Sequence, residues 1–419
     1  MSAFLPPLSR PAGDSGSVRT LDNGVRVFVL PEPDRSAAVL GVWVEHGSRY
    51  EAAGEAGLAH LLEHMLFKGT RSYSVRSLAE AMDRLGHEVE AWTGRELTAF
   101  SLEVLREDAG EALGLLCEMV AHPTLPGDEL SRERTVVAAE AAMVREDPEA
   151  WLLDELVRAA WPGHPAGTPV VGDPEGIARV ERETLAAYHR RHYTGDRILV
   201  GVAGDVDPDA VAEQCARELG DLPRGGRPAD TAPVFAEGRG ERRGHTEQVH
   251  LALCAPGPGR TRPERFAAGV ANHVLGASVT SRLFRELRED RGLAYTVYSD
   301  LELHRDCGLW IAYLACPPEE WRRARDLVGE ILEDVLANGL TAEEIGRARH
   351  GMRAGLLRQG EALEQRLHQA AGDLLYHGRR IPREERLDLL GRVDQEAVHQ
   401  ALGAWARIQE LCLAPRAED

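Results

Sequence analysis

The sequence predicts an α+β protein made of two homologous units, each with an antiparallel-rich sheet packed against helices. Two observations predict this class. Strand-like and helix-like segments follow one another in the same order over residues 18–206 and 248–415. Between them, residues 221–247 are rich in Gly, Pro and Arg and show no period, which is typical of a linker. A diverged tandem duplication explains both, with domains over residues 1–220 and 248–419.

The first unit alternates strands and helices along its length. It opens with two β-rich segments, the first of which contains an Asn-Gly turn, and a helix with a run of apolar residues follows. The remaining elements are a helix ending at Gly86, a pair of strands at 87–93 and 96–105, long helical segments over about 107–121 and 128–160, and a strand near 197–206.

The second unit repeats this order at lower similarity. We expect, in sequence, a strand at 248–256, helices at 264–276 and 281–292, strands at 293–303 and 307–316, two long helices, and a last strand near 409–415.

The composition excludes several classes of partner. The chain of 419 residues carries 49 basic and 68 acidic side chains, so that its formal net charge of −19 argues against nucleic acid and anionic membranes and favours basic ligands. The six cysteines contain no C-x-x-C pair and are typical of reduced thiols. No apolar stretch reaches 18 residues and the N-terminus lacks the pattern of a secretion signal, which predicts a cytoplasmic protein.

Two histidines and a glutamate interrupt the apolar stretch GLAHLLEHMLFKGT at residues 57–70. On a helix, His60 and His64 lie four residues apart on one face, with Glu63 beside them. The order H-x-x-E-H is the signature of one class of zinc peptidases. Because five residues recur by accident, the motif alone leaves open a buried helix whose polar residues have found unrelated partners.

A hydrolytic zinc site usually needs a third protein ligand. Residues 128–147 are helical by composition, and Glu133 and Glu140 lie on one helical face together with Val136, Val137, Met143 and Val144. Carboxylates on an apolar stripe are costly to bury unless they are paired or bind a metal. The alternative is that this helix lies at the domain edge, where both glutamates are solvated.

Four stretches, in this order, closely resemble the pitrilysin/insulysin family, especially the branch of mitochondrial processing peptidase and its bacterial relatives. They read GSRYEAAGEAGLAHLLEHMLFKGT, ERTVVAAEAAMVREDPEAW, GHPAGTPVVGDPEGI and SRLFRELREDRGLAYTVYS. The resemblance runs from about residue 18 to the C-terminus. It implies the processing-peptidase fold, which is also that of LuxS-like metallohydrolases.

The resemblance implies a complete metal site. In the family, the third zinc ligand is a glutamate some 76 residues after the second histidine, which here is Glu140. His60, His64 and Glu140 would then bind one Zn²⁺ per chain, although their ligand types also suit Mn²⁺ or Co²⁺. Glu63 would be the general base that acts on the attacking water. Glu133 would support the site without binding the metal itself.

The resemblance also implies residues that contact the substrate. An arginine and a tyrosine seven residues apart hold the scissile carbonyl in the family, and they match Arg288 and Tyr295. Taken alone, an arginine near a helix end and a tyrosine in a strand are commonplace. Peptides in this family add to an edge strand, which here reads Glu90, Ala91, Trp92 and Thr93. Glu90 replaces the usual asparagine of that strand, so we expect a preference for basic residues in the substrate.

These features predict a zinc endopeptidase or oligopeptidase that acts on unfolded peptides or leader sequences. The alternative is a non-catalytic assembly subunit, because core proteins of respiratory complexes share this fold without peptidase activity. Relatives resembling insulysin join four such units in one chain, with zinc on the first and the arginine and tyrosine on the fourth. A chain of two units is therefore expected to form a homodimer, or alternatively a heterodimer with a zinc-less homologue.

Overall fold

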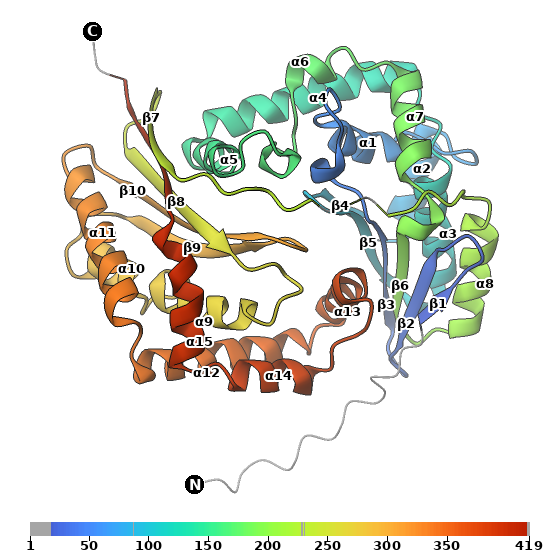
Figure 1. Cartoon of the computed structure of the whole chain (residues 1–419). Helices are drawn as coiled ribbons and strands as arrows, with labels where there is room; N and C mark the ends of the chain where they lie inside the picture. Colours follow the sequence, from blue (N-terminus) through green and yellow to red (C-terminus); the bar gives the residue numbers. More distant parts are fainter. Residues whose placement is uncertain (1–17, 87, 228, 230, 417–419) are drawn as a thin grey trace, which may run out of the picture.

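The computed structural model describes residues 18–86, 88–227, 229 and 231–416 and contains two sheets (Figure 1). The first sheet has the strand order β1-β2-β6-β3-β5-β4, and β4 forms one of its edges. Its strands are β1 (Val18–Thr20), β2 (Arg26–Pro31), β3 (Ala37–Val44), β4 (Glu90–Thr93), β5 (Thr98–Leu105) and β6 (Ile198–Gly204). Its helices are α1 (Leu58–Leu66), α2 (Val75–Arg84), α3 (Ala109–Ala121), α4 (Gly127–Glu146), α5 (Pro148–Ala160), α6 (Pro174–Ile177), α7 (Arg182–His192) and α8 (Pro208–Leu219).

The second sheet has the order β7-β11-β8-β10-β9, with β9 at an edge. Its strands are β7 (Gly238–Gly244), β8 (Val249–Gly257), β9 (Thr296–Leu303), β10 (Gly308–Cys316) and β11 (Gln409–Pro415). The helices of this half are α9 (Arg265–Leu275), α10 (Arg282–Phe284), α11 (Trp321–Asn338), α12 (Ala342–Gln359), α13 (Leu363–His377), α14 (Arg383–Gly391) and α15 (Gln395–Gly403).

The two sheets repeat one topology. In the first, β2 runs parallel to β6, and the neighbours β6–β3, β3–β5 and β5–β4 are antiparallel. In the second, β7 runs parallel to β11, and the neighbours β11–β8, β8–β10 and β10–β9 are antiparallel. Five strands thus match one for one, while β1 is an addition to the first sheet. The predicted fold class of two homologous α+β units is confirmed.

Each sheet buries one face against helices of its own half. In β2, Val27 and Val29 point into a core shared with α1, α3, α7 and α8, whereas Phe28 and Leu30 point to the opposite face. This follows from the alternation of side chains along a strand. Because both faces are apolar, each sheet needs a second covering layer.

The second layer comes from the other half of the chain. Helix α13 lies against β3 and β6 of the first sheet, with Leu367 and Leu374 packed on Phe28 and Trp43. Helix α5 lies against β8 and β11 of the second sheet, where Leu156 joins the apolar face. Figure 1 shows α13 beside the first sheet and α5 beside the second. The halves are therefore joined by an exchange of helices.

Three local expectations need correction. The helical segment expected over 128–160 is two helices, because Asp147 and Pro148 end α4 and begin α5. Residues 238–244, expected within the linker, form β7, an Arg- and Gly-rich edge strand whose polar side chains hide its strand character. The two long helices expected after β10 are five, α11 to α15.

Two other expectations are not settled. His87, the first residue of the strand expected at 87–93, lies outside the described residues, and the domain boundaries stay a prediction.

Within the described part of the chain, no helix is long and apolar enough to cross a membrane.

Candidate metal centre

Helix α1 carries the H-x-x-E-H motif and is fixed against the first sheet by its apolar face. It begins after Gly57, whose φ of 92° favours glycine, and a Cβ there would lie 2.8 Å from the carbonyl oxygen of Val171. The buried residues of the helix include Leu58, Leu61, Leu62 and Met65. Their spacing places His60 and His64 on the remaining face, where both are partly exposed.

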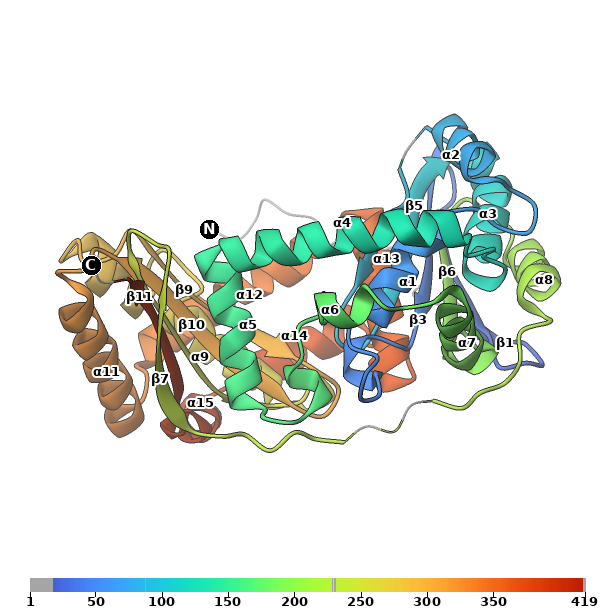
Figure 2. The ribbon, with the colours of Figure 1, turned by 90° about the horizontal axis from the view of Figure 1, so that it is seen from above.

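Helix α4 supplies the two glutamates and crosses α1. Figure 2 shows α4 running across the molecule from the first half towards α5. Val137 is fully buried and fixes the helix rotation, so that Glu133 and Glu140, four residues before it and three after it, both face α1. Val136 and Met143, expected on the same apolar stripe, are instead exposed, at 42% and 68%.

Three ligand atoms meet at one point between these helices. The Nε2 atoms of His60 and His64 lie 3.3 Å apart. Glu140 Oε2 lies 3.6 Å from each of them. With metal–ligand bonds of 2.0–2.1 Å, the ligands of a tetrahedral zinc ion are separated by about 3.3 Å. The three side chains therefore fit a zinc ion with a fourth position left open.

A second row of contacts orients His64. Its Nδ1 hydrogen-bonds to Glu133 Oε2 at 3.0 Å, which leaves the Nε2 lone pair for a metal. The other oxygen of Glu133 pairs with Lys68 Nζ at 2.8 Å, and Lys68 is the only lysine of the chain. Burial alone would raise the pKa of Glu133, but hydrogen bonds from Lys68 and His64 outweigh it and hold the pKa below its usual value.

His60 can bind a cation without first losing a proton. Burial, helped by the neighbouring His64, lowers the pKa of His60 to about 4, so its imidazole is neutral at physiological pH. Among the described residues, His60 Nδ1 has no hydrogen-bond partner, unlike His64 Nδ1.

Glu63 lies next to the cluster but is not part of it. Its side chain is buried, and burial raises the pKa of the carboxyl, against the lowering effect of a hydrogen bond from Thr93 and of His64. A carboxylate whose pKa is raised towards neutrality is suited to proton transfer.

Arg288 and Tyr295 lie together but far from this cluster. The guanidinium of Arg288 stacks over the ring of Tyr295 at 4.7 Å and over Phe284 at 4.8 Å. Arg288 belongs to a π-helical turn, Arg285–Glu289, that extends α10, and Tyr295, 76% exposed, directly precedes β9. Figure 1 shows α10, which this turn extends, on the opposite side of the molecule from α1, the helix of the two candidate histidine ligands.

Strand β4, predicted to bind peptides, lies at an edge of the first sheet. Within the part of the chain that the structure describes, it pairs with β5 alone, and no strand lies on its other side. Glu90 and Trp92 are exposed, whereas Ala91 and Thr93 point towards the interior and are half-buried.

Glu51 is a residue of the site that sequence reasoning missed. Its two carboxylate oxygens accept hydrogen bonds from the backbone N–H groups of Gly57 and Ala59, at 3.0 and 2.8 Å, and thereby cap the start of α1. Burial raises its pKa to about 7, against the lowering effect of these two bonds. One signal could have found it: no Ser, Thr, Asp or Asn stands at the N-cap of this helix.

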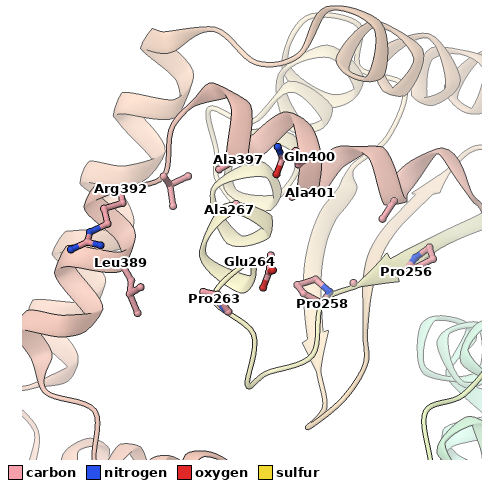
Figure 3. A pocket seen from close by; sticks show the side chains of 13 residues that line it. Pro256, Pro258, Pro263, Glu264, Ala267, Leu389, Arg392, Ala397, Gln400 and Ala401 are labelled. Carbon is pink, nitrogen blue, oxygen red and sulfur yellow. The ribbon is translucent and has the colours of Figure 1, made fainter.

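The three candidate ligands His60, His64 and Glu140 are partly exposed. A cavity of 470 Å³ lies in the second half, among α9, α14 and α15 (Figure 3). Its wall is mostly apolar and includes Pro256, Pro258, Pro263 and Leu389. None of the residues at the metal cluster lines it.

Comparison with protein families gives two matches in tandem. Residues 26–174 match the model for Insulinase (Peptidase family M16), and residues 179–352 match the model for the Peptidase M16 inactive domain. An uncharacterized zinc protease of Mycobacterium bovis is 37% identical over 91% of this chain and 88% of its own length. The uncharacterized zinc protease YmxG of Bacillus subtilis is 32% identical over 91% of this chain and 93% of its own.

Solved structures share the fold of the whole chain. A protease from Helicobacter pylori superposes with a TM-score of 0.87 at 20% identity, covering 96% of this chain and 99% of its own. A peptidase M16 inactive domain from Pseudomonas fluorescens gives 0.86 at 22% identity, with 96% and 98% covered. Together with the sequence relatives, these matches show that the chain belongs to the insulinase family, peptidase family M16.

Proposed function

We propose that the protein is a zinc-dependent endopeptidase or oligopeptidase that hydrolyses unfolded peptides or leader sequences. The observation that carries this proposal is the meeting of His60 Nε2, His64 Nε2 and Glu140 Oε2 at tetrahedral spacing beside the buried Glu63. The family model for an inactive domain matches only residues after 178, and all three ligands precede them.

Each residue then has one task. His60, His64 and Glu140 hold the ion, and Glu133 keeps His64 in the required tautomer. Zinc, when bound, supplies a Lewis acid that polarises the scissile carbonyl and acidifies the attacking water. Glu63 takes a proton from that water and passes it to the leaving amine.

The substrate is an extended peptide that adds to the free edge of β4. Main-chain hydrogen bonds to an edge strand bind peptides of many sequences, which suits general turnover of unfolded chains. Glu90 is exposed on this strand and adds a negative charge, so basic side chains are favoured.

The test is zinc-dependent cleavage of a peptide library. Protein stripped with a chelator should lose its activity, and one equivalent of zinc per chain should restore it, with cleavage enriched near Lys and Arg. If the purified protein holds no zinc, cannot be reloaded and cleaves no peptide, the alternative of a non-catalytic assembly subunit is favoured.

The assembly we propose is a symmetric homodimer with two shared sites. Each site would use zinc from one subunit, together with Arg288 and Tyr295 of the partner subunit, whose donors would hold the scissile carbonyl as negative charge develops. Support comes from the separation of α1 and α10 within one chain and from the exposure of Tyr295. In a heterodimer with a zinc-less homologue, the Arg288 and Tyr295 pair of this chain would face a subunit without zinc and would have no site to complete.

Mixing two inactive variants tests the shared site. Glu63→Gln and Tyr295→Phe subunits should each be nearly inactive. After complete exchange at equal concentrations, half of the dimers are mixed and one of their two sites is intact, so about a quarter of the parental activity should return. As a control, Glu63→Gln mixed with the Glu63→Gln/Tyr295→Phe double variant should recover nothing. If subunits exchange and no activity returns in the first mixture, the shared site is wrong.

A further inference from the structure

Thr93 ends the edge strand β4 and points away from the surface that a peptide would use. It faces Thr98 on β5 in the register of the sheet. Along β4, Glu90 and Trp92 are exposed, while Thr93 is half-buried and turned towards α1. The role predicted for it from the sequence, peptide binding, uses only its backbone. Its hydroxyl is therefore available for another role.

The proton of that hydroxyl has one best acceptor. Thr93 Oγ1 lies 2.5 Å from Glu63 Oε2 and 3.4 Å from Thr98 Oγ1. The hydroxyl of Thr98 donates to the carbonyl oxygen of His46 at 3.0 Å, so Thr98 has no proton left to give to Thr93. The short contact to a carboxylate is also the stronger bond. The geometry thus directs the proton of Thr93 to Glu63.

This bond is the principal restraint on the Glu63 carboxylate. In the described part of the chain, Thr93 is the one group that donates a hydrogen bond to it. The buried hydroxyl of Tyr193 interacts electrostatically with Glu63 but, among the described residues, donates no hydrogen bond to it. With Oε2 held by Thr93, Oε1 is the oxygen left to accept a proton. Because this one hydrogen bond orients the carboxylate of Glu63, its loss should leave the carboxylate free to turn away from the attacking water.

We propose that Thr93 is a positioning residue that aims the carboxylate of Glu63. Thr93 also belongs to the edge strand β4. A peptide that pairs with β4 therefore holds the strand in place, and Thr93 on that strand orients the carboxylate of Glu63. Binding and alignment are thereby coupled through one side chain, and poorly seated peptides are cleaved slowly even when bound. This inference rests on the proposed peptidase function and adds a determinant of its rate.

The test compares variants that remove or keep the hydroxyl. Thr93→Val preserves the shape and should lower kcat by roughly 10- to 100-fold, as expected for a misaligned catalytic group. KM should stay within about threefold of the parent and zinc content should be unchanged. Thr93→Ser keeps the donor and should restore most of kcat. Thr93→Ala, which cannot introduce a clash, should repeat the loss.

Two further measurements separate positioning from a structural role. In a Glu63→Gln background, Thr93→Val should cause no additional loss, because the group through which it acts is already gone. Thr135→Val, a hydroxyl deletion at an exposed position of α4, should retain parental kinetics.

Several outcomes would overturn the inference. Parental kcat in Thr93→Val, a change in KM alone, or loss of zinc together with activity each contradict a role in aiming Glu63. Additive losses in the double variant do the same. An active parent with an active Thr93→Val variant rejects this inference only, whereas an inactive parent that cleaves no peptide rejects the proposed function as well.

Discussion

Glu63→Gln is expected to keep its zinc and to lose peptidase activity by about 10²–10⁴-fold, the usual cost of removing a general base. The substitution preserves the size of the side chain and can still accept the hydrogen bond from Thr93. It removes only the ability to take a proton. Because Glu63 lies outside the group of three ligand atoms, the affinity for zinc should change little.

The measurement is the initial rate of peptide cleavage at equal, verified zinc content. Glu146→Gln is a matched control, since it makes the same chemical change at an exposed position at the end of α4 and should retain parental activity. A Glu63→Gln rate above about a tenth of the parental rate would reject the assigned role, because a general base contributes more than this.

Glu140→Gln is expected to have the second large effect, on zinc rather than on proton transfer. Glu140 Oε2 is the one anionic atom of the cluster, and an amide oxygen in its place is a much weaker ligand for zinc. Glu133→Gln should weaken zinc binding less, on the order of 10–100-fold, because Glu133 acts through the ring of His64.

Competition with a chromogenic chelator gives the zinc dissociation constant of each variant. The decisive result is the order of the zinc affinities. Glu140→Gln should bind zinc more weakly than Glu133→Gln, and Glu133→Gln more weakly than the parent. Parental zinc affinity in Glu140→Gln would remove Glu140 from the ligand set. Equal losses in both variants would instead indicate that the helix α4 has moved.

The sequence predicts the repeated elements because hydrophobic period and turn residues are local properties. It correctly places β3, β5 and α1, whose alternation or apolar stripe is strong. Strand β7 is missed because an edge strand with both faces in water needs no apolar alternation. The exchange of α5 and α13 could not be predicted. In the sequence, each of these helices shows only an apolar stripe, and such a stripe does not indicate which of the two sheets the helix covers.

At the candidate site, too, local features could be predicted from the sequence and contacts between separate elements could not. Helical spacing places His60 beside His64 and Glu133 in line with Glu140, and the structure brings these side chains together, while their roles stay predictions. The missing N-cap residue of α1 indicates that some side chain must cap this helix, but not that Glu51 accepts the two bonds, and the bond from Thr93 to Glu63 leaves no signal in the sequence. These bonds join residues whose proximity depends on how separate elements pack.

The exchange of helices decides where such a molecule can open. Swinging the halves apart about a hinge within the chain would strip α13 from the first sheet or α5 from the second. Each large apolar side chain uncovered in this way costs about 1.5–3 kcal/mol, and Leu367, Leu374 and Leu156 would be among them. A single chain therefore behaves as one stiff shell. In the proposed homodimer, a peptide would then enter or leave where the two subunits separate.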